Sequence, residues 1–303
     1  MFRSLVIAGA ALVSVSAFAA DLGYKKPAPV AATSAMCKEK KALPADAFGF
    51  ATGSDVMDLG AWAGAVDNTY VAGGRGGKAY GYTGVAQVST SFFPCLEVGP
   101  YLYYSLAGFK PFGGAETKGT VLGGGVEMKY KVFGRATHGV GMTLAVSPNF
   151  GAYNGFTIYG GHSSVFSNSY RMLVDAELVK DKLYGALNIE LFQSAYDNTR
   201  PGFRNLSQFN VRGALTYAAT DALFVGAEAN VQIAKTGMWA DGRFRASAAY
   251  VGPTFLWAIN DKWTLNGTFR TQIAGTDKTG PGRKLGTAVF PVNQARLKLA
   301  YTF

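Results

Sequence analysis

Residues 292–303 read VNQARLKLAYTF, and their polarity alternates with a period of two. Ala295, Leu297, Leu299, Tyr301 and Phe303 are apolar, whereas the residues between them are mostly polar. Successive side chains of a strand point to opposite faces, so the pattern predicts a strand with one apolar and one polar face. Soluble sheets contain such strands as well. The solvent that meets the apolar face therefore has to be inferred from the rest of the chain.

Residues 1–19 have the features of a secretory signal peptide. Arg3 supplies a positive charge, an apolar run extends from Leu5 to Val15, and small residues at 17–19 surround a predicted cleavage site. The apolar run is shorter than the ~20 residues that a helical membrane span needs. Because no later segment is long and apolar, we expect an exported chain that enters a membrane with strands rather than helices.

The composition favours β structure. Glycine accounts for 39 of 303 residues, aromatic residues for 14% and charged residues for only 16%. The formal net charge is +10. An exported chain rarely meets nucleic acid, so the expected partners of this charge are anionic lipid head groups, including lipopolysaccharide, or anionic solutes.

The alternating pattern recurs throughout residues 51–303, whereas residues 20–50 are rich in Ala, Pro and Lys. We expect residues 20–50 to form an extended periplasmic segment. The rest contains about twelve stretches of strand type. They lie near 57–70, 79–93, 96–106, 125–132, 140–150, 170–179, 183–193, 209–217, 223–233, 243–258, 263–273 and 292–303.

The connections between these stretches alternate in length. Short ones follow Phe93 and occupy 180–182, 218–222 and 260–262, with 133–139 slightly longer; the longer ones lie near 71–78, 109–117, 152–169, 196–208, 236–242 and 275–290. This predicts an all-β, antiparallel up-and-down transmembrane barrel of about 12 strands with both termini in the periplasm. Closure of the barrel removes edges that lipid cannot satisfy. The apolar face then meets lipid, and an aromatic girdle contains Tyr217, Trp257, Trp263, Tyr301 and Phe303.

Two stretches resemble a known class of proteins. RLKLAYTF at 296–303 resembles the last strand of Gram-negative outer-membrane proteins, and ADLGYKKPAP at 20–29 resembles the mature start of many alphaproteobacterial ones. The architectural resemblance covers roughly residues 50–303. It implies that the barrel-assembly machinery reads the terminal pattern, formed by Leu297, Leu299, Tyr301 and Phe303.

The inward face of such a barrel is its functional surface. We expect it to carry Glu97, Asp175, Glu177, Glu190, Arg212, Glu228, Arg245, Arg270, Arg296 and Lys298. Acids on one part of the wall and bases on another would create a transverse field that passes hydrated solutes. Alternatively, these charges pair and close a lumen only modestly wider than that of a filled eight-stranded barrel. The expected function is a porin-like channel for passive diffusion of small hydrophilic solutes or ions, without a cofactor, as a monomer or an oligomer.

Two other function classes remain open. An outer-membrane phospholipase or lipid A deacylase needs a His-based constellation, but His138 falls at a short turn and His162 in a loop beside Ser163 and Ser164. Adjacent residues do not form a triad, so we do not expect an enzyme. No Cys/His spacing indicates a metal site. A structural or adhesion barrel that acts through its extracellular loops is the third class.

The two cysteines, Cys37 and Cys95, both fall on the predicted periplasmic side, and the periplasm is oxidising. We therefore expect a disulfide bond between them. The bond would close a loop of 58 sequence positions, which corresponds to roughly 4 kcal/mol on the chain-entropy model. It would tether the N-terminal segment, with Lys38, Lys40 and Lys41, at the periplasmic mouth.

Overall fold

The computed structural model describes residues 47–74, 77–111, 116–154, 162–197, 205–237, 242–278, 285 and 289–303. They all belong to one compact unit, Thr33–Phe303. The predicted signal peptide, Cys37 and most of the segment 20–50 lie outside the described residues. Within the described ranges, no helix is both long and apolar enough to cross a membrane.

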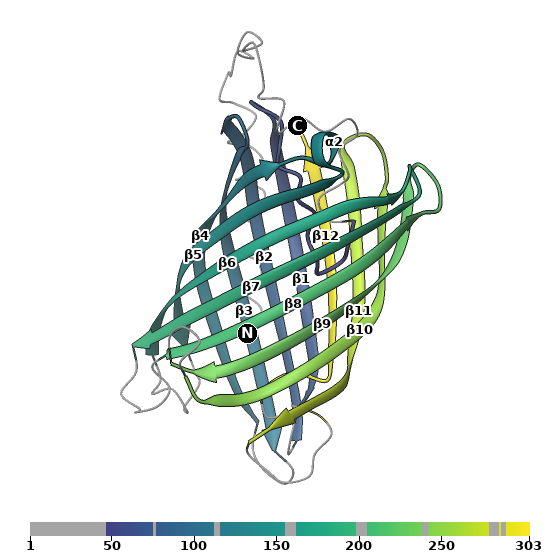
Figure 1. Cartoon of the computed structure of the whole chain (residues 1–303). Helices are drawn as coiled ribbons and strands as arrows, with labels where there is room; N and C mark the ends of the chain where they lie inside the picture. The colour runs from purple at the N-terminus through teal and green to yellow at the C-terminus, as the bar shows by residue number, and fades with distance from the viewer. Residues whose placement is uncertain are drawn as a thin grey trace. The chain divides into compact units, whose positions relative to one another are not determined.

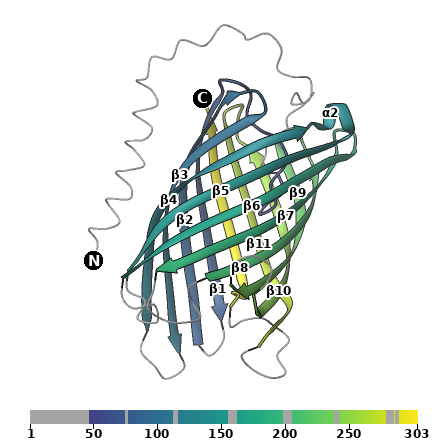
Figure 2. The same ribbon diagram turned by 60° about the vertical axis from the view of Figure 1, so that its left-hand side comes forward.

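Twelve antiparallel strands of the described residues form a closed barrel (Figure 1; Figure 2). Each strand pairs with the next along the chain, and the last pairs with the first. The predicted fold is therefore confirmed. The strands are β1 (Trp62–Gly74), β2 (Gly77–Phe93), β3 (Leu96–Pro111), β4 (Thr117–Phe133), β5 (Val140–Asn154), β6 (His162–Val179), β7 (Leu183–Asp197), β8 (Asn205–Ala218), β9 (Leu223–Thr236), β10 (Phe244–Ala258), β11 (Trp263–Asp277) and β12 (Asn293–Thr302).

Several strands are longer than the sequence pattern indicated, and they lengthen toward the end with the long connections. β6 has 18 residues, whereas β12 has 10. Gly74 pairs with Gly77, so the long connection expected near 71–78 is instead a tight hairpin. The extensions are rich in glycine, as in TKGTVLGG at 117–124, or in serine, as in HSSVFSNS at 162–169. They lack a clear apolar alternation, which is why the pattern missed them.

The start of the barrel also differs from the expectation. β1 begins at Trp62, not near residue 57 or at the predicted domain boundary of residue 51. The described residues before Trp62 turn into the barrel instead of continuing its wall. In the sequence, Leu59 and Ala61 continue the apolar alternation of β1. In the structure, neither residue is paired with a residue of β2 or β12.

The two faces of the wall differ in polarity as predicted. On β9, Val225 and Val231 are 40% and 48% exposed on the outside, whereas Glu228, Asn230 and Gln232 are buried on the inside. An outer band of this kind is stable in a lipid bilayer, where strands must also satisfy their own backbone groups. The barrel therefore has the wall of a membrane protein.

Aromatic side chains gather on the outside at the end with the short turns. Tyr217, Trp257 and Trp263 are exposed there. The rings of Trp263 and Tyr301 lie 4.7 Å apart, and those of Tyr301 and Phe303 lie 5.0 Å apart. Large amphipathic rings are favoured where hydrocarbon meets water. These contacts agree with the aromatic girdle predicted from the sequence.

One of the turns at this end contains a single helical turn. α2 (Arg135–His138) connects β4 to β5 and ends at Gly139, whose φ of 72° lies in the left-handed region. The Gly139 N–H donates to the Arg135 carbonyl oxygen. A residue with a Cβ would be strained there, so the glycine ends the helix. The turn holds Arg135 at the mouth of the barrel.

The last residue takes part in closure of the barrel. The backbone N–H of Phe303 donates to the carbonyl oxygen of Trp62 at 3.0 Å, and that of Thr302 donates to Lys262 at 2.9 Å. Leu297, Leu299 and Phe303 are exposed on the outer face. β12 is therefore paired on both edges to its end, and its apolar side chains face outward.

We predict that deletion of Phe303 lowers the amount of folded barrel. The deletion removes one backbone hydrogen bond and one aromatic contact at the seam, each of which contributes about 1 kcal/mol. The heat-modified shift in gel mobility of the membrane-extracted protein measures the folded fraction. Phe303→Trp, which keeps the backbone and an aromatic ring, is the matched control. A deletion variant that folds as well as the parent chain would contradict the prediction.

Candidate functional site: the lumen and its inner segment

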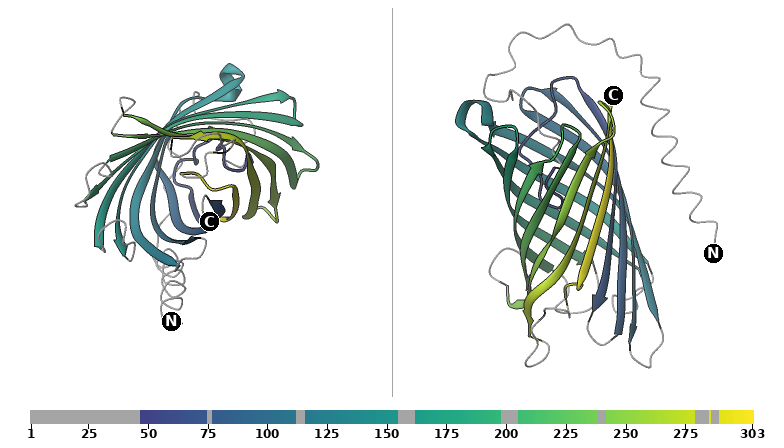
Figure 3. Two further views of the ribbon diagram at one scale, coloured as in Figure 1. Left: turned by 90° about the horizontal axis from the view of Figure 1, so that it is seen from below. Right: turned by 90° about the vertical axis from the view of Figure 1, so that its right-hand side faces the viewer.

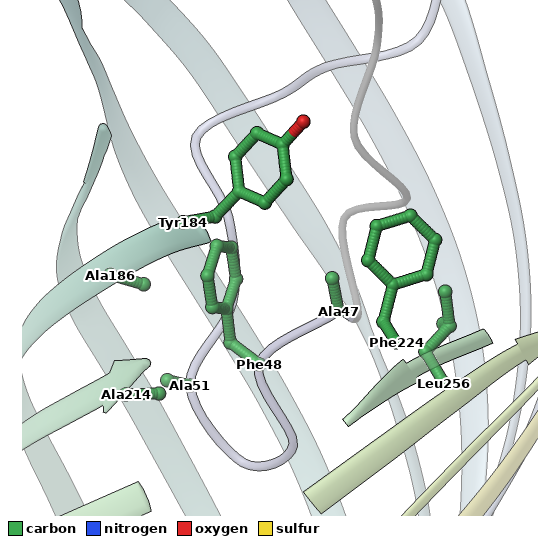
Figure 4. Packing of buried hydrophobic residues seen from close by; sticks show 8 residues of the cluster. All are labelled: Ala47, Phe48, Ala51, Tyr184, Ala186, Ala214, Phe224 and Leu256. Carbon is green, nitrogen blue, oxygen red and sulfur yellow. The ribbon is translucent and has the colours of Figure 1, made fainter. Parts of the chain in front are cut away.

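Residues 47–60, here called the inner segment, lie inside the ring of strands near the short turns (Figure 3). Ala47, Phe48 and Ala51 are completely buried. They pack against inward-facing residues of β7–β10, which Figure 4 shows: Tyr184, Ala186, Ala214, Phe224 and Leu256. The alanines on β7 and β8 leave space for the Phe48 ring. Its burial stabilises the packed state by about 1.5–3 kcal/mol.

A tight turn lets the inner segment approach the wall closely. Gly49 has a φ of +78°, and a Cβ there would lie 2.5 Å from Cγ2 of Thr254 and 2.9 Å from Oε2 of Glu228. Only glycine accepts both the backbone conformation and the contact without strain. The turn presents the next residue, Phe50, to the charged part of the wall.

Polar side chains of the wall bind the backbone of the inner segment. The Phe50 N–H donates to the Glu228 carboxylate at 2.8 Å, and the Ser54 N–H donates to the Asp175 carboxylate at 2.7 Å. Asn188 forms two bonds with Thr52, accepting from its N–H at 2.6 Å and donating to its carbonyl oxygen at 2.8 Å. Buried peptide groups need partners, and here side chains replace a neighbouring strand. The inner segment therefore fits this wall specifically.

A compact charge cluster fixes the middle of the inner segment. The Asp55 carboxylate contacts Nζ of Lys131 at 2.8 Å and Nη2 of Arg135 at 2.6 Å. Arg135 also contacts the Asp175 carboxylate, at 2.6 Å through Nη1. Burial opposes the charge of the guanidinium, but the two carboxylates outweigh it and raise the pKa of Arg135 above its ordinary value. Arg135 thus links α2, β6 and the inner segment.

A cation–π contact holds the tip of the inner segment. The guanidinium of Arg270 lies 3.8 Å from the centroid of the Phe50 ring and 5.1 Å from that of Tyr250. Arg296 lies 5.7 Å from the Phe50 ring and donates to the carbonyl oxygen of Gly49. A desolvated cation–π contact contributes about 2 kcal/mol. β11 and β12 therefore contact the same turn as β9 and β10.

The other end of the lumen also receives a loop residue. Phe290, from the connection between β11 and β12, is 5% exposed and packs against Ala234, Ala246, Ala248 and Tyr250. The Tyr250 hydroxyl donates to the carbonyl oxygen of Pro291 at 2.6 Å. Small inward residues on β9 and β10 thus leave space for a ring from this loop. In the described conformation, chain segments enter the barrel from both ends.

The charged residues predicted from the sequence fall mostly on the inward face. Glu97, Asp175, Glu190, Glu228 and Arg270 are buried or nearly so there, and Arg212, Arg296 and Lys298 are half-buried on the inward positions of β8 and β12. Many of these charges have partners on neighbouring strands. Lys129 contacts Glu97 and Glu127 at 3.0 Å each, Arg171 contacts Glu127, Arg212 contacts Glu190, and Arg296 contacts Asp67 at 2.7 Å.

This arrangement differs from the expected separation of acids and bases on opposite walls. The ion pairs join residues on the same or adjacent parts of the wall, so positive and negative charge alternate around it. Such pairs cancel most of each other's field. Of the two alternatives drawn from the sequence, the described residues show charge pairing.

Two residues of the predicted set lie elsewhere. Glu177 is exposed at the rim, where its carboxylate accepts the N–H of Asp181 in the turn between β6 and β7. At the start of β10, the buried inward positions are Ala246, Ala248 and Tyr250. Arg245 alternates with them and therefore lies on the outer face, as the other odd-numbered residues of this strand do. The prediction chose the wrong phase for β10, because small apolar residues line the lumen there, where Phe290 packs.

Other residues of the charge network were absent from the predicted set. Glu127, Lys129 and Lys131 alternate with apolar residues on β4, so the strand pattern contains the signal for them. Arg171 on β6 is a similar case. Asp55 and Arg135 lie outside the strands, where no periodicity applies. Only the fold brings these two residues together.

The histidines do not form a candidate catalytic constellation in the described part of the chain. His138 is exposed in α2 and contacts the Thr137 hydroxyl at 2.7 Å, while its ring lies 5.0 Å from that of Phe133. His162 begins β6, and its side chain lies outside the described set, as does that of Ser163. The described residues also contain no group of three or more His, Cys, Asp or Glu arranged to hold a metal ion.

Comparison with known proteins places this barrel in a family. The model of the family of unknown function DUF6662 matches residues 45–303. The chain belongs to this family. A search of curated proteins found no match.

Solved structures of outer-membrane barrels share the fold. The COG4313 outer membrane channel from Pseudomonas putida F1 superposes with a TM-score of 0.54 at 13% identity, covering 87% of this chain and 100% of that one. The β domain of the Bordetella autotransporter BrkA gives 0.53 at 12% identity, covering 81% and 100%. The transport unit of the Escherichia coli autotransporter AIDA-I gives 0.53 at 11% identity, covering 82% and 93%. Identities this low establish the fold alone, which is that of Gram-negative outer-membrane barrels.

We predict that Asp55→Asn loosens the inner segment. The substitution leaves Lys131 and Arg135 without their shared carboxylate, and breaking a buried ion pair costs about 3 kcal/mol. Backbone amides at 50–55 should then exchange hydrogen roughly a hundredfold faster. Asp58→Asn makes the same change at an exposed position of the inner segment and should leave exchange unaltered. Equal protection in the two variants would contradict the prediction.

Proposed function

We propose that this protein is an outer-membrane channel for small hydrophilic solutes or ions, and that the inner segment holds it closed in the described conformation. The observation that carries the proposal is that a separate chain segment, the inner segment, fills a polar lumen. Polar interiors occur both in barrels that conduct and in barrels that are plugged, so the buried inward residues Asn188, Asn230, Gln232, Asn266 and Gln272 do not distinguish the two. A filling that belongs to a segment before the first strand, and not to the wall itself, can leave the lumen.

The way in which the inner segment is bound supports a reversible closure. Hydrogen bonds to Glu228, Asn188 and Asp175 and the ion pair of Asp55 with Lys131 hold most of it, and water can replace each of these contacts. If the segment left the lumen, the side chains that bound it would remain as a hydrated, charged lining. Such a lining passes polar solutes and resists apolar ones.

The proposal includes a location and partners. The chain would be exported by a cleaved signal peptide at 1–19, recognised by the barrel-assembly machinery through its last strand, and inserted among outer-membrane lipids and lipopolysaccharide. The end with the short turns and α2 would face the periplasm, so the inner segment would close the periplasmic side. A lipid-modifying hydrolase is less well supported, because His138 lies exposed at a turn at this same end.

Single-channel recording in a planar bilayer tests the channel. We predict that replacing residues 47–58 by a Gly/Ser sequence of equal length gives larger and longer-lived open steps than the parent chain, because the lumen loses its filling. Asp58→Asn is the matched control and should behave as the parent. Absence of conductance from both the parent and the replaced chain would overturn the proposal, and so would an unchanged conductance after replacement.

The disulfide between Cys37 and Cys95 is part of the proposed closure. Cys95 lies in the tight turn between β2 and β3, with a φ of 66°, and its carbonyl oxygen accepts the Lys131 N–H at 2.9 Å. A bond from this turn to Cys37 would anchor the chain that leads into the inner segment. We predict that proteolysis of the unreduced protein releases one linked pair of peptides that contains both cysteines, and that reduction separates them. Two separate, alkylatable thiol peptides without prior reduction would contradict the bond.

A further inference from the structure

Four tyrosines face the lumen between the middle of β3 and the long-connection ends of β5 and β7. Tyr101 and Tyr103 lie on β3, Tyr153 on β5 and Tyr196 on β7, and all four are half-buried. The ring centroids of Tyr101 and Tyr103 are 6.4 Å apart, and those of Tyr153 and Tyr196 are 5.7 Å apart. We call these residues the tyrosine wall. The ion pairs and the contacts of the inner segment described above are formed by other residues.

Glycines on the neighbouring strands let two of the rings lie against the wall. A Cβ at Gly125 would lie 2.7 Å from Cζ of Tyr101, and a Cβ at Gly123 would lie 2.5 Å from Cζ of Tyr103. A Cβ at Gly151 would lie 2.3 Å from the Tyr103 hydroxyl oxygen. One side of the Tyr101 ring and one side of the Tyr103 ring therefore pack against the backbone at these glycines. The half-exposed remainder of each ring is turned toward the lumen.

The strand register places polar groups beside the tyrosine wall. Tyr101 pairs with Gly125, Gly125 with Asn149, Asn149 with Ser167, and Ser167 with Ser194, so these residues form one row around the barrel. The Tyr103 hydroxyl lies 3.5 Å from Oδ1 of Asn149. Among the described residues, Oγ of Ser194 is buried without a hydrogen-bond partner. The row combines aromatic faces with amide and hydroxyl groups.

The outer face of the same strands carries a different set of aromatic and apolar residues. Leu102, Phe150 and Phe166 are exposed outside, and the rings of Phe150 and Phe166 lie 4.9 Å apart. Tyr104, next to Tyr103 on β3, is also exposed outside, so tyrosine occurs on both faces of this strand. A tyrosine ring has an apolar face and a polar edge, and it is stable in either surrounding.

We propose that the tyrosine wall binds a neutral sugar that enters the channel. A pyranose ring presents C–H groups on its face and hydroxyls around its edge. The C–H face fits the negative face of an aromatic ring, and the hydroxyls fit Asn149 and the serines of the row. An apolar aromatic solute would leave those polar groups unpaired, which costs affinity. The nearest charges, Glu127 and Arg171, neutralise each other, so nothing there favours an ion. The inference rests on the proposed channel and names its substrate class.

The test measures binding to the folded full-length protein in detergent by saturation-transfer NMR and calorimetry. Maltotriose is the probe, sorbitol is a control with similar hydroxyls but no ring, and phenol is a control with a ring but no sugar hydroxyls. We expect maltotriose to bind at least about tenfold more tightly than sorbitol, a factor that corresponds to about 1.4 kcal/mol. Equal binding of sorbitol, or tighter binding of phenol, would overturn the inference.

Variants of neighbouring residues on one strand locate the site. Tyr103→Ala should weaken maltotriose binding about tenfold, whereas Tyr103→Phe, which keeps the ring, should weaken it by no more than about threefold. Tyr104→Ala is the matched control, because Tyr104 is the next residue on β3 and is 40% exposed on the outer face. If Tyr103→Ala does not fold, judged by heat-modified gel mobility, Tyr196→Ala and Tyr196→Phe replace that pair. Equal losses in the inner and outer alanine variants would overturn the inference.

Bilayer recording separates this inference from the proposed function. Open steps that maltotriose interrupts in the parent but not in Tyr103→Ala support both. Open steps without any binding of maltotriose overturn the sugar site and leave the channel standing. Binding of maltotriose by a chain that never conducts overturns the channel and supports sugar recognition by the tyrosine wall.

Discussion

The pairing of β1 with β12 is the interaction on which the rest of the structure depends. In a bilayer, an unpaired strand edge leaves N–H and C=O groups that no solvent can satisfy, so an open sheet of these strands would not be stable there. The seam runs from Ala63–Thr302 to Ala72–Asn293 without a break in register. Closure converts the polar face of every strand into the lining of one interior. Each contact described in the lumen exists because two strands at opposite ends of the sequence meet.

Closure also places ionised side chains in a narrow interior, where ion pairs compensate for the lost solvation. Ionised groups in a narrow, poorly hydrated lumen lose solvation, and they remain charged only if opposite charges or hydrogen bonds replace the water. Lys129 between Glu97 and Glu127, and Arg135 between Asp55 and Asp175, are such arrangements. The inner segment takes part in this compensation, because it contributes Asp55 and several backbone donors. Binding of the segment therefore completes the neutralisation of one part of the wall, around Lys131 and Arg135.

The lumen is organised in layers along its axis. Apolar packing around Phe48 and the Asp55 charge cluster lie toward the short turns, and a belt of ion pairs follows. The tyrosine wall extends from the middle of β3 to the long-connection ends of β5 and β7. Phe290 and Tyr250 pack together on another part of the wall, at β9 and β10. A solute from the long-connection end would meet aromatic and hydroxyl groups first and the inner segment last. The polar contacts that bind the inner segment are thus concentrated toward the short turns.

The amino-acid sequence by itself determined the strands and their two faces. Residues 292–303 and the stretches like them carry a local signal, because the polarity of a strand residue depends only on which side of the sheet it occupies. Strand number, barrel class and the outward position of Leu297, Leu299 and Phe303 follow from that signal. So do most of the inward charges, for example Glu190, Glu228 and Arg270.

Only the tertiary structure decided how those inward residues are paired and what fills the space between them. Lateral neighbours on a sheet depend on register, and the alanines of β10 that receive Phe290 reverse the polarity expected of its two faces, so Arg245 lies outside the predicted face. The inner segment has no periodicity of its own, and several of its contacts join residues more than a hundred positions apart, such as Phe50 and Glu228. The tyrosine wall likewise requires the five strands β3–β7 in one particular register. Periodicity is a property of a single strand, and the sequence pattern therefore contains it. The pairing of inward residues and the filling of the lumen are properties of the closed barrel, and the sequence pattern does not contain them.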